Sequence, residues 1–372
     1  MPIKDPIDAT LEAADAPAPD HGEKPDDPPK LTGKSWKYAF KRALKEFGSD
    51  GATDLAAMLT YYTVLSLAPA LLAIFSIITL VLANNADTVT TLVDDLVQQY
   101  VPADYQPLVI NLVETMMGSA SGGVIALIVS IAIALWSSSK YVKAFSRCLN
   151  TVYEVEEGRG FVRQTMIMLL TTLCMLLGVV LILVSLALNE TLVTGTLGPL
   201  ADPLGLGGTL NFLTQTFLPI WAWVKWPFIL ALVITMIAML YYFTPNVKEP
   251  KFTWIGVGSI VAIVGIAIAG VALSIYLRQF AGYSSYGAIG TVMALLFVLW
   301  IFNIVLLLGA EVDAEVERAR QLQAGIEAEE MIQLPPRDIK AVQKKKDARD
   351  KLEADGRVLR LSLSEGTSSK DA

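Results

Sequence analysis

This 372-residue chain has 36 Asp and Glu residues but only one histidine and two cysteines, which limits the acid–base and metal chemistry open to it. Its one histidine, His21, lies in a stretch rich in Pro and Asp, which argues against histidine catalysis, a catalytic triad and most zinc sites. No Gly-x-x-x-x-Gly-Lys-Ser/Thr loop is present, which argues against ATP hydrolysis. The carboxylates near apolar stretches cluster at the ends of those stretches: Asp54, Glu154, Glu156, Glu157, Glu311, Asp313 and Glu315. The sequence therefore predicts no catalytic residues, no metal, no cofactor and no enzyme.

Lys225 is the cation that the sequence places closest to an apolar interior. Its neighbours Trp221, Trp223 and Trp226 are typical of an interfacial aromatic belt. An ammonium at the centre of a bilayer costs about 2.5–3.5 kcal/mol, so Lys225 either reaches the headgroups or contacts an anionic substrate in an outward-facing cavity. Arg278 closes another apolar stretch on the same side and is a candidate companion.

Other polar groups fall inside the apolar stretches. Pro69 follows Tyr61, Tyr62, Thr63 and Ser66, and a carbonyl freed by proline in lipid must be satisfied by side chains or water. The amide of Asn303 is expected to form a hydrogen bond between helices. The candidate pathway residues are Tyr61, Tyr62, Ser66, Pro69, Lys225, Arg278, Tyr286 and Asn303. Small residues at Gly256, Gly258, Gly265 and Gly270 predict close helix packing more strongly than a ligand site.

The elements that must position these groups are six long uncharged stretches. They run approximately over residues 55–83, 115–139, 165–189, 220–247, 252–277 and 288–310. Each is long enough for a helix to cross a hydrocarbon core of about 30 Å. With 53% hydrophobic and 17% charged residues, the composition agrees with a membrane protein. The sequence predicts an all-α, polytopic membrane protein with six transmembrane helices.

The cations indicate the orientation. Of the 29 Lys and Arg residues, 27 precede the first stretch, follow the sixth, or lie between the second and third or the fourth and fifth. Segments 84–114 and 190–224 contain none. Because cytoplasmic loops carry the excess of Lys and Arg, both termini are predicted to be cytoplasmic. The expected location is the bacterial inner membrane.

Four parts are predicted along the chain. Residues 1–33 form a disordered cytoplasmic tail, since they are polar and rich in proline. Residues 34–50 form a basic amphipathic helix on the inner leaflet, in contact with anionic lipid headgroups, although a helix packed on the bundle has the same pattern. Residues 51–310 form the six-helix membrane domain, and 311–372 a charged, partly helical cytoplasmic tail. The balanced charge of this tail argues against a nucleic-acid partner.

The segment after the first stretch has helical periodicity of its own. Apolar residues recur at helical spacing before and after Pro102, which predicts two short amphipathic helices on the outer side. They either cap a cavity between the spans or lie on the bundle.

Several segments resemble the YihY/BrkB family of bacterial inner-membrane proteins, some of which were once named ribonuclease BN. The resemblance rests on residues 56–69, Trp136 to Ser139, Leu149-Asn150 with Tyr153, Arg159 and Phe161, residues 241–246, Tyr276, Tyr286 to Gly290, and Leu308 to Glu311. It covers roughly residues 35–320 and implies a six-span inner-membrane protein with a transporter-like role in the cell envelope.

Three function classes follow. The first is a transporter or flippase-like carrier for an amphipathic or anionic envelope compound, supported by the resemblance, Pro69 and the pair Lys225 and Arg278. The second is a membrane scaffold that organises envelope partners through the charged tail and the outer loop. An intramembrane enzyme ranks third, because a nuclease needs histidines or metal-binding carboxylates in an aqueous cleft.

Overall fold

The computed structural model describes residues 5–16, 30–81, 123–188, 207–248, 256–280 and 287–368, and isolated positions at 94–111 and 193–194. Within these residues the chain is almost entirely helical, and no strand occurs apart from one isolated bridge between Val247 and Pro336. The predicted all-α class is confirmed.

Each predicted span overlaps one long helix among the described residues. These helices are α3 (Ala52–Val81), α6 (Gly123–Val152), α7 (Phe161–Ala187), α10 (Leu218–Phe243), α11 (Val257–Phe280) and α12 (Gly287–Gln323). Among the described residues, three helices are long and apolar enough to cross a membrane: Phe161–Ala187, Gly207–Phe243 and Val292–Gln323. A shorter apolar helix covers Val257–Ala272. The protein is therefore a polytopic helical membrane protein; the number of six spans and their orientation stay predictions.

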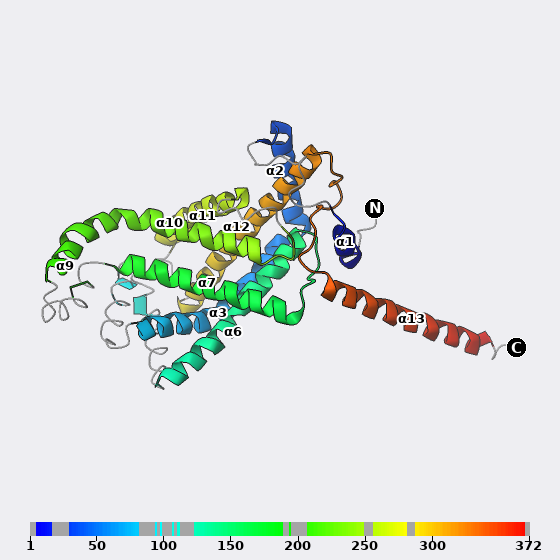
Figure 1. Cartoon of the computed structure of the whole chain (residues 1–372), viewed down its shortest axis with the longest axis horizontal. Coiled ribbons are helices and arrows are strands. Elements are labelled where there is room, and N and C mark those ends of the chain that lie inside the picture. The colour runs from blue at the N-terminus through cyan, green and yellow to red at the C-terminus, as the bar shows by residue number, and fades with distance from the viewer. Residues whose placement is uncertain are drawn as a thin grey trace.

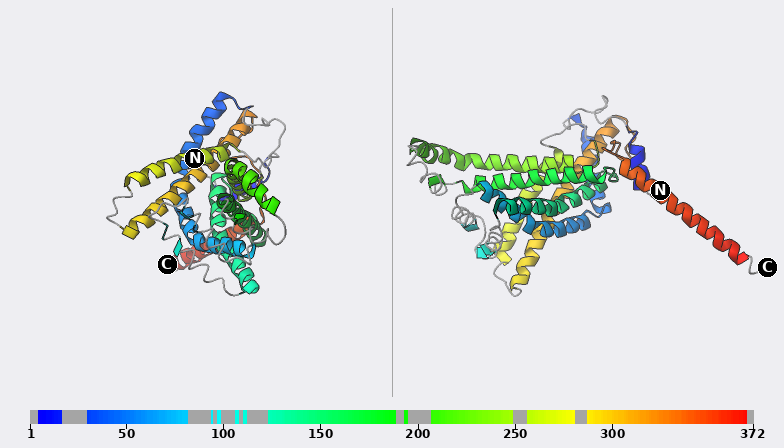
Figure 2. Two further views of the ribbon diagram at one scale, coloured as in Figure 1. Left: turned by 90° about the vertical axis from the view of Figure 1, so that its left-hand side faces the viewer. Right: turned by 60° about the horizontal axis from the view of Figure 1, so that its bottom comes forward.

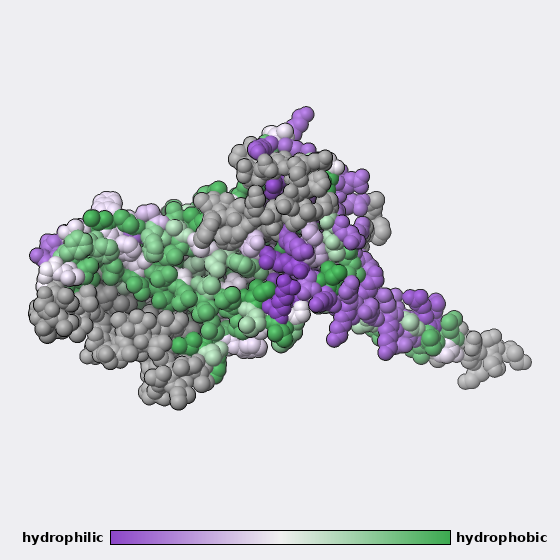
Figure 3. All heavy atoms as spheres, in the orientation of Figure 1, coloured by the Kyte–Doolittle hydropathy of each residue, from purple (hydrophilic) through white to green (hydrophobic). Residues whose placement is uncertain are grey.

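Four of the long helices, α3, α6, α7 and α10, run roughly alongside one another (Figure 1). Helices α11 and α12 pack closely on each other, and the first half of α12 leans with α11 away from α7 and α10 (Figure 2). The second half of α12 packs on α2 (Gly33–Ser49). In the space-filling view apolar residues cover most of the bundle, whereas polar residues gather at one end and along α13 (Lys340–Ser368) (Figure 3). We call the end of the bundle where these polar residues gather the charged end.

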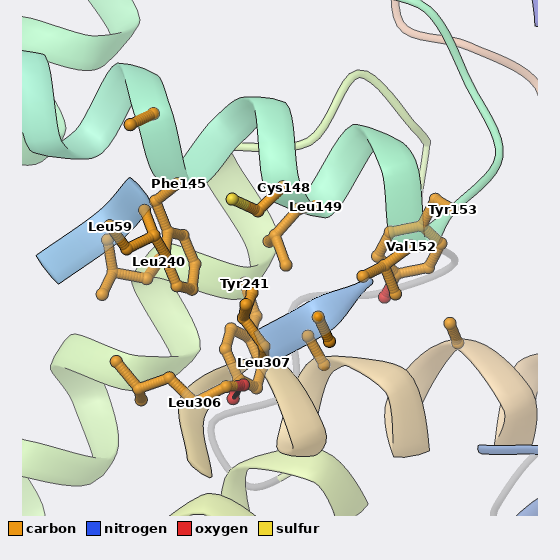
Figure 4. Packing of buried hydrophobic residues seen from close by; sticks show 14 of the residues in the cluster. Leu59, Phe145, Cys148, Leu149, Val152, Tyr153, Leu240, Tyr241, Leu306 and Leu307 are labelled. Atoms are coloured by element: carbon orange, nitrogen blue, oxygen red, sulfur yellow. Dashed lines mark hydrogen bonds between the residues drawn. The ribbon is translucent and has the colours of Figure 1, made fainter. Parts of the chain in front are cut away.

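The core near the charged end joins α6, α10 and α12. Tyr241 of α10 lies between the helices, stacked on Phe145 of α6 with 6.2 Å between ring centroids (Figure 4). Its hydroxyl donates to the backbone carbonyl of Leu306 at 2.5 Å. A buried tyrosine hydroxyl needs such a partner, so this contact fixes α10 against α12.

Glycines let α11 and α12 approach closely, as their spacing predicts. A Cβ on Gly258 would lie 2.6 Å from Asp313 Cγ, and one on Gly309 would lie 2.9 Å from the Cβ of Ala262. The short distance also allows the backbone N–H of Gly258 to donate to Asp313 Oδ1 at 2.6 Å. Gly265 packs against Val305 in the same interface.

The N-terminal region differs from the expected disorder at residues 5–16. Pro6–Ala13 forms α1, whose first turn is capped by Asp5. Asp5 and Asp8 form ion pairs with Arg349 of α13, and Thr10 Oγ1 accepts from the backbone N–H of Glu156 at 2.7 Å. The composition of residues 1–33 does not predict this helix, because the residues that the helix contacts lie more than 140 positions further along the sequence.

Helix α2 has two different faces. Thr32 caps it by accepting from Ser35 N at 3.2 Å. Ala39 and Ala43 are buried against α12. The predicted lipid-facing stripe consists of Trp36, Phe40, Leu44 and Phe47; Phe40 and Leu44 are exposed, whereas Trp36 and Phe47 pack on the bundle. The helix therefore packs on the bundle with one face and leaves apolar side chains on another. Lipid contact by that face stays a prediction.

The tail and the outer loop complete the comparison. The predicted tail helices correspond to the end of α12 and to α13, with the interruption at residues 324–339. The two amphipathic helices expected within 84–114 lie mainly outside the described residues.

Candidate functional site: a buried charged layer

The charged end contains ionisable side chains that are removed from the surface. The members of this charged layer, most of them buried, are Asp50, Glu154, Glu157, Arg159, Glu311, Glu315 and Arg318. Arg159 and Arg318 are 2% and 1% exposed. Charges are rarely buried without partners, so each of these side chains requires an explanation.

Arg159 joins three segments of the chain. Its guanidinium donates to both carboxylate oxygens of Glu157, at 2.8 and 2.7 Å. It also donates to Ser146 Oγ at 3.2 Å and to the backbone carbonyls of Phe243 and Thr244 at 3.2 and 2.6 Å. These carbonyls close the C-terminal end of α10, where the helix dipole favours a cation. Arg159 thus holds the end of α10 against α6.

An amide network continues from this arginine. Asn150 Oδ1 accepts from the backbone N–H of Asn246 at 2.8 Å, and Asn246 Nδ2 donates to the carbonyls of Glu156 and Asp338 at 2.9 and 3.0 Å. Asp338 belongs to the segment after α12, so the network ties that segment to the bundle. Arg337 adds hydrogen bonds to the carbonyls of α10 and of the residues that follow it.

Arg318 is the second centre of the charged layer. It donates to both oxygens of Glu315 at 3.0 Å, to Glu154 Oε1 at 2.7 Å and to the carbonyl of Ala328 at 2.9 Å. Glu315 also lies 3.4 Å from the guanidinium of Arg42 on α2. One turn of α12 is therefore bonded to α2, to the end of α6 and to the loop beyond α12.

Glu154 reaches this centre through an uncommon backbone conformation. Its φ is 57°, and it is the one non-glycine residue with positive φ in the described part of the chain. Its other carboxylate oxygen accepts from the backbone N–H of Ile332 at 3.1 Å. A left-handed backbone conformation is costly for a residue other than glycine, and here the ion pair between Glu154 and Arg318 offsets that cost.

Glu311 and Asp50 form the acidic part of the layer. Glu311 is 1% exposed, and neither carboxylate oxygen has a hydrogen-bond partner among the described residues. Asp50 follows α2 and is partly buried. Burial raises the pKa of Asp50 to about 6, and the nearby carboxylates of Glu46 and Glu154 act in the same direction.

A pH dependence follows for Asp50. Because its folded-state pKa lies above its unfolded value, ionisation of Asp50 destabilises the fold as pH rises through the interval from about 4 to about 6. Asp50→Asn removes this penalty, so we expect the variant to gain apparent melting temperature over the native protein at about pH 8 and little at about pH 4. Tryptophan fluorescence of the detergent-solubilised protein, followed on heating, measures the melting temperature at each pH. An equal difference at the two pH values would contradict the prediction.

Five polar side chains of α3, α6 and α12 lie within the bundle, and we call this set the polar column. It consists of Thr60 and Ser66 of α3, Ser138 and Tyr141 of α6, and Asn303 of α12. Asn303 is fully buried, accepts from the Tyr141 hydroxyl at 2.9 Å and donates to the carbonyl of Leu299 and to Thr60 Oγ1 at 2.8 and 3.3 Å. The expected interhelical bonds of Asn303 are present. Ser66 and Ser138 are buried, and their hydroxyls have no hydrogen-bond partner among the described residues.

The other predicted residues of α3 lie beside this column. Tyr61 is 61% exposed and meets Tyr62 edge to face at 5.5 Å. Tyr62 is partly buried, and the guanidinium of Arg147 lies over its ring at 5.5 Å. Pro69 lies inside the continuous helix α3.

Lys225 is separate from this group. It is partly buried near the opposite end of α10, with Nζ 5.6 Å from the centroid of Trp226. Trp223 is 82% exposed, and Trp221 donates to the carbonyl of Ser185 at 3.3 Å. These surroundings are those of an aromatic belt. The side chain of Arg278 and all of Tyr286 lie outside the described residues, so their pairing with Lys225 stays a prediction.

Sequence reasoning missed Tyr141, Thr60 and the two buried arginines as site residues. The spacing of Glu311, Glu315 and Arg318 could have pointed to Arg318, since i, i+4 and i+7 share one helix face. Nothing comparable marks Arg159, whose partners come from three segments.

The comparisons with known proteins agree with this organisation. Residues 43–332 match the family described as Virulence factor BrkB. The chain belongs to this family. The matched BrkB region contains the charged layer and the polar column in full, and it ends within the segment that contacts Arg318.

Individual relatives of this BrkB-family chain carry different names. It is 30% identical over 288 residues to the ribonuclease-like protein YfkH of Bacillus subtilis, covering 77% of this chain and 96% of that protein. It is 27% identical over 290 and 291 residues to UPF0761 membrane proteins of Albidiferax ferrireducens and Ralstonia nicotianae, covering 76% and 77% of this chain. The matches span 63% and 59% of those two longer proteins. No solved structure matches the chain.

Proposed function

We propose that this BrkB-family protein is a membrane carrier for an amphipathic, anionic compound of the cell envelope, and not an enzyme. In this proposal the protein lies in the bacterial inner membrane with its charged end facing the cytoplasm. The observation that carries the proposal is the polar column, in which the hydroxyls of Ser66 and Ser138 are buried without a hydrogen-bond partner among the described residues. Buried hydroxyls without partners lower stability, so their presence favours a role other than packing.

The surface of α6 near the charged end supports an anionic, amphipathic cargo. Lys143 Nζ lies 4.8 Å from the ring centroid of Trp136, which is 50% exposed. Arg147, one turn further on, covers Tyr62 of α3. Cations held over aromatic rings offer an anionic headgroup a charge and its apolar part a flat surface. Tyr62 connects this surface to α3, the helix that also carries Thr60 and Ser66.

The divergence of α11 and α12 from the other helices also supports a carrier. The two halves of the bundle are joined mainly at the charged end, where α12 packs on α2, α3 and α6 (Figure 2). Carriers alternate by rocking one group of helices against another around such a contact.

The two unpartnered serines test this function without the usual loss of stability. Replacing Ser66 and Ser138 together by alanine removes two unsatisfied hydroxyls, so we expect unchanged or higher stability, by up to about 1 kcal/mol per site. Transport is expected to fall severalfold, because the column loses polar groups that face the cargo. The measurement is movement of fluorescently labelled phosphatidylglycerol across liposomes that contain the reconstituted protein.

Thr235→Val is the matched control, since this partly buried threonine of α10 donates its hydroxyl to the carbonyl of Ala231 in its own helix. It should transport as the native protein does. If the native protein moved neither labelled phosphatidylglycerol nor a fluorescent organic anion faster than empty liposomes, the carrier proposal would fail. Normal transport by the double serine variant would remove the polar column from the mechanism.

A further inference from the structure

The unpartnered carboxylate of Glu311 is the feature of the charged layer that its ion pairs leave unexplained. Glu311 follows directly after the predicted span 288–310, on the face of α12 that also carries Glu315. Two nearby arginines, Arg318 and Arg42, form their ion pairs with other carboxylates. Arg318 bonds Glu315 and Glu154, and Arg42 lies between Glu315 and Glu46.

The charged groups around Glu311 come from every side and are mostly acidic. From α2 and the residue after it come Glu46 and Asp50, from the end of α6 comes Glu154, and from α12 itself comes Glu315. On its α11 side, α12 carries Asp313, whose carboxylate is bonded to Gly258 N, and α10 places the hydroxyl of Tyr241 on the carbonyl of Leu306. None of these contacts supplies a donor to Glu311.

An ionised carboxylate in this position would be unstable. Desolvation and like charges both disfavour the ionised form, and no hydrogen bond compensates. A bound cation or a bound proton would remove the cost. A divalent metal has little support, since no group of three or more His, Cys, Asp or Glu side chains suited to a metal occurs among the described residues. A proton needs no ligand shell.

We propose that Glu311 is a proton-binding site through which transport by this protein is coupled to protons. This inference rests on the proposed carrier function. Glu311 holds a proton in the conformation described here, and it releases the proton when the charged layer opens to water. The O–H bond of the carboxyl breaks, and the proton passes to the carboxylate of Asp50 or to water, leaving Glu311 ionised.

The position of Glu311 fits a coupling role. Asn303 lies eight residues earlier on α12, which is about 12 Å and slightly more than two turns along the helix. Glu311 therefore lies between the polar column and the carboxylates of Glu46 and Asp50 near the surface. A change in its charge would act on both, because Asn303 belongs to the same helix and the carboxylates of Glu46 and Asp50 interact electrostatically with Glu311.

Infrared spectroscopy of the full chain in lipid bilayers tests the proton site directly. At neutral pH in choline chloride we expect the carbonyl band of a protonated carboxylic acid in the native protein. The band should be absent in Glu311→Gln and retained in Glu46→Gln, which removes a neighbouring, partly exposed carboxylate. Glutamine is the neutral isostere of protonated glutamate, so Glu311→Gln is expected to fold. Absence of the band from the native protein, or its survival in Glu311→Gln, overturns the proposal.

Sodium is the competing ligand, and the same sample tests it. Replacing choline chloride by sodium chloride should leave the band unchanged. Loss of the band in sodium chloride would show a sodium site and overturn the proton proposal.

Transport measurements test the coupling. An imposed pH gradient is expected to change the rate of labelled phosphatidylglycerol movement severalfold in the native protein and not in Glu311→Gln. A native protein that transports equally with and without the gradient would overturn the coupling. A native protein that shows the infrared band but transports nothing would overturn the carrier function while leaving the proton site intact.

Discussion

Arg318→Met is expected to lower the free energy of unfolding by about 3 kcal/mol or more, because one partner of a buried ion pair is lost. Glu315 has a side chain that is 2% exposed and would keep only Arg42, at 3.4 Å. The carbonyl of Ala328 would lose its donor as well. Equilibrium unfolding in mixed micelles of detergent and sodium dodecyl sulfate measures the change.

Two variants make this result specific. In Arg318→Met with Glu315→Met, the buried charge that remained unpaired is replaced by an apolar side chain, so part of the lost stability should return. Arg357→Met breaks an exposed pair with Glu353, at 3.4 Å, and should cost less than about 1 kcal/mol. If Arg318→Met cost no more than Arg357→Met, the charged layer would not stabilise the fold.

The long apolar helices could be predicted from sequence because lipid imposes a simple rule. A helix must stay apolar over its whole crossing, and each of the six stretches overlaps one long helix of the described residues. The end of the sixth stretch was predicted less well. Glu311 marks the predicted boundary, yet α12 continues without a break to Gln323. A change in polarity does not end a helix when the charged residues are good helix formers.

The candidate site was predictable only where its contacts are local or helical. The amide of Asn303 was expected to bond another helix, but Tyr141 as its partner is 162 residues away and carries no signal in the sequence. Lys225 shows the opposite case. Its neighbouring tryptophans indicate a belt, and its described contact is with one of them, Trp226.

The sequence did not predict the buried charges, and the reason is physical. Rules of charge distribution treat Lys and Arg near span ends as solvated, and Arg159 and Arg318 were counted in that way. Whether such a cation is buried depends on acceptors brought by other segments. Carbonyls at the end of α10 and at Ala328 supply them here. The packing that brings acceptors to Arg159 and Arg318 brings no donor to Glu311 from the described part of the chain. The charged layer therefore contains two stabilising arginines and one carboxylate without a partner among the described residues.

Arg159→Met is expected to cost about 3–5 kcal/mol, since the buried guanidinium binds Glu157 through two hydrogen bonds and three further oxygens. The end of α10 should loosen with it. Hydrogen exchange of the amides from Leu240 to Val247 is expected to accelerate together with the loss of stability.

Arg159→Lys and Arg163→Met complete the test of this anchor. Lysine keeps the charge but cannot bind Glu157 through a planar fork, so Arg159→Lys should lose less stability than Arg159→Met while still exposing the end of α10 to exchange. Arg163 pairs with Asp338 at 3.0 Å, but its side chain is 57% exposed. Arg163→Met should therefore cost less than about 1 kcal/mol. Equal effects of Arg159→Met and Arg163→Met would mean that burial of Arg159 adds nothing, and that the end of α10 is held by its other contacts, such as those of Arg337 and Asn150.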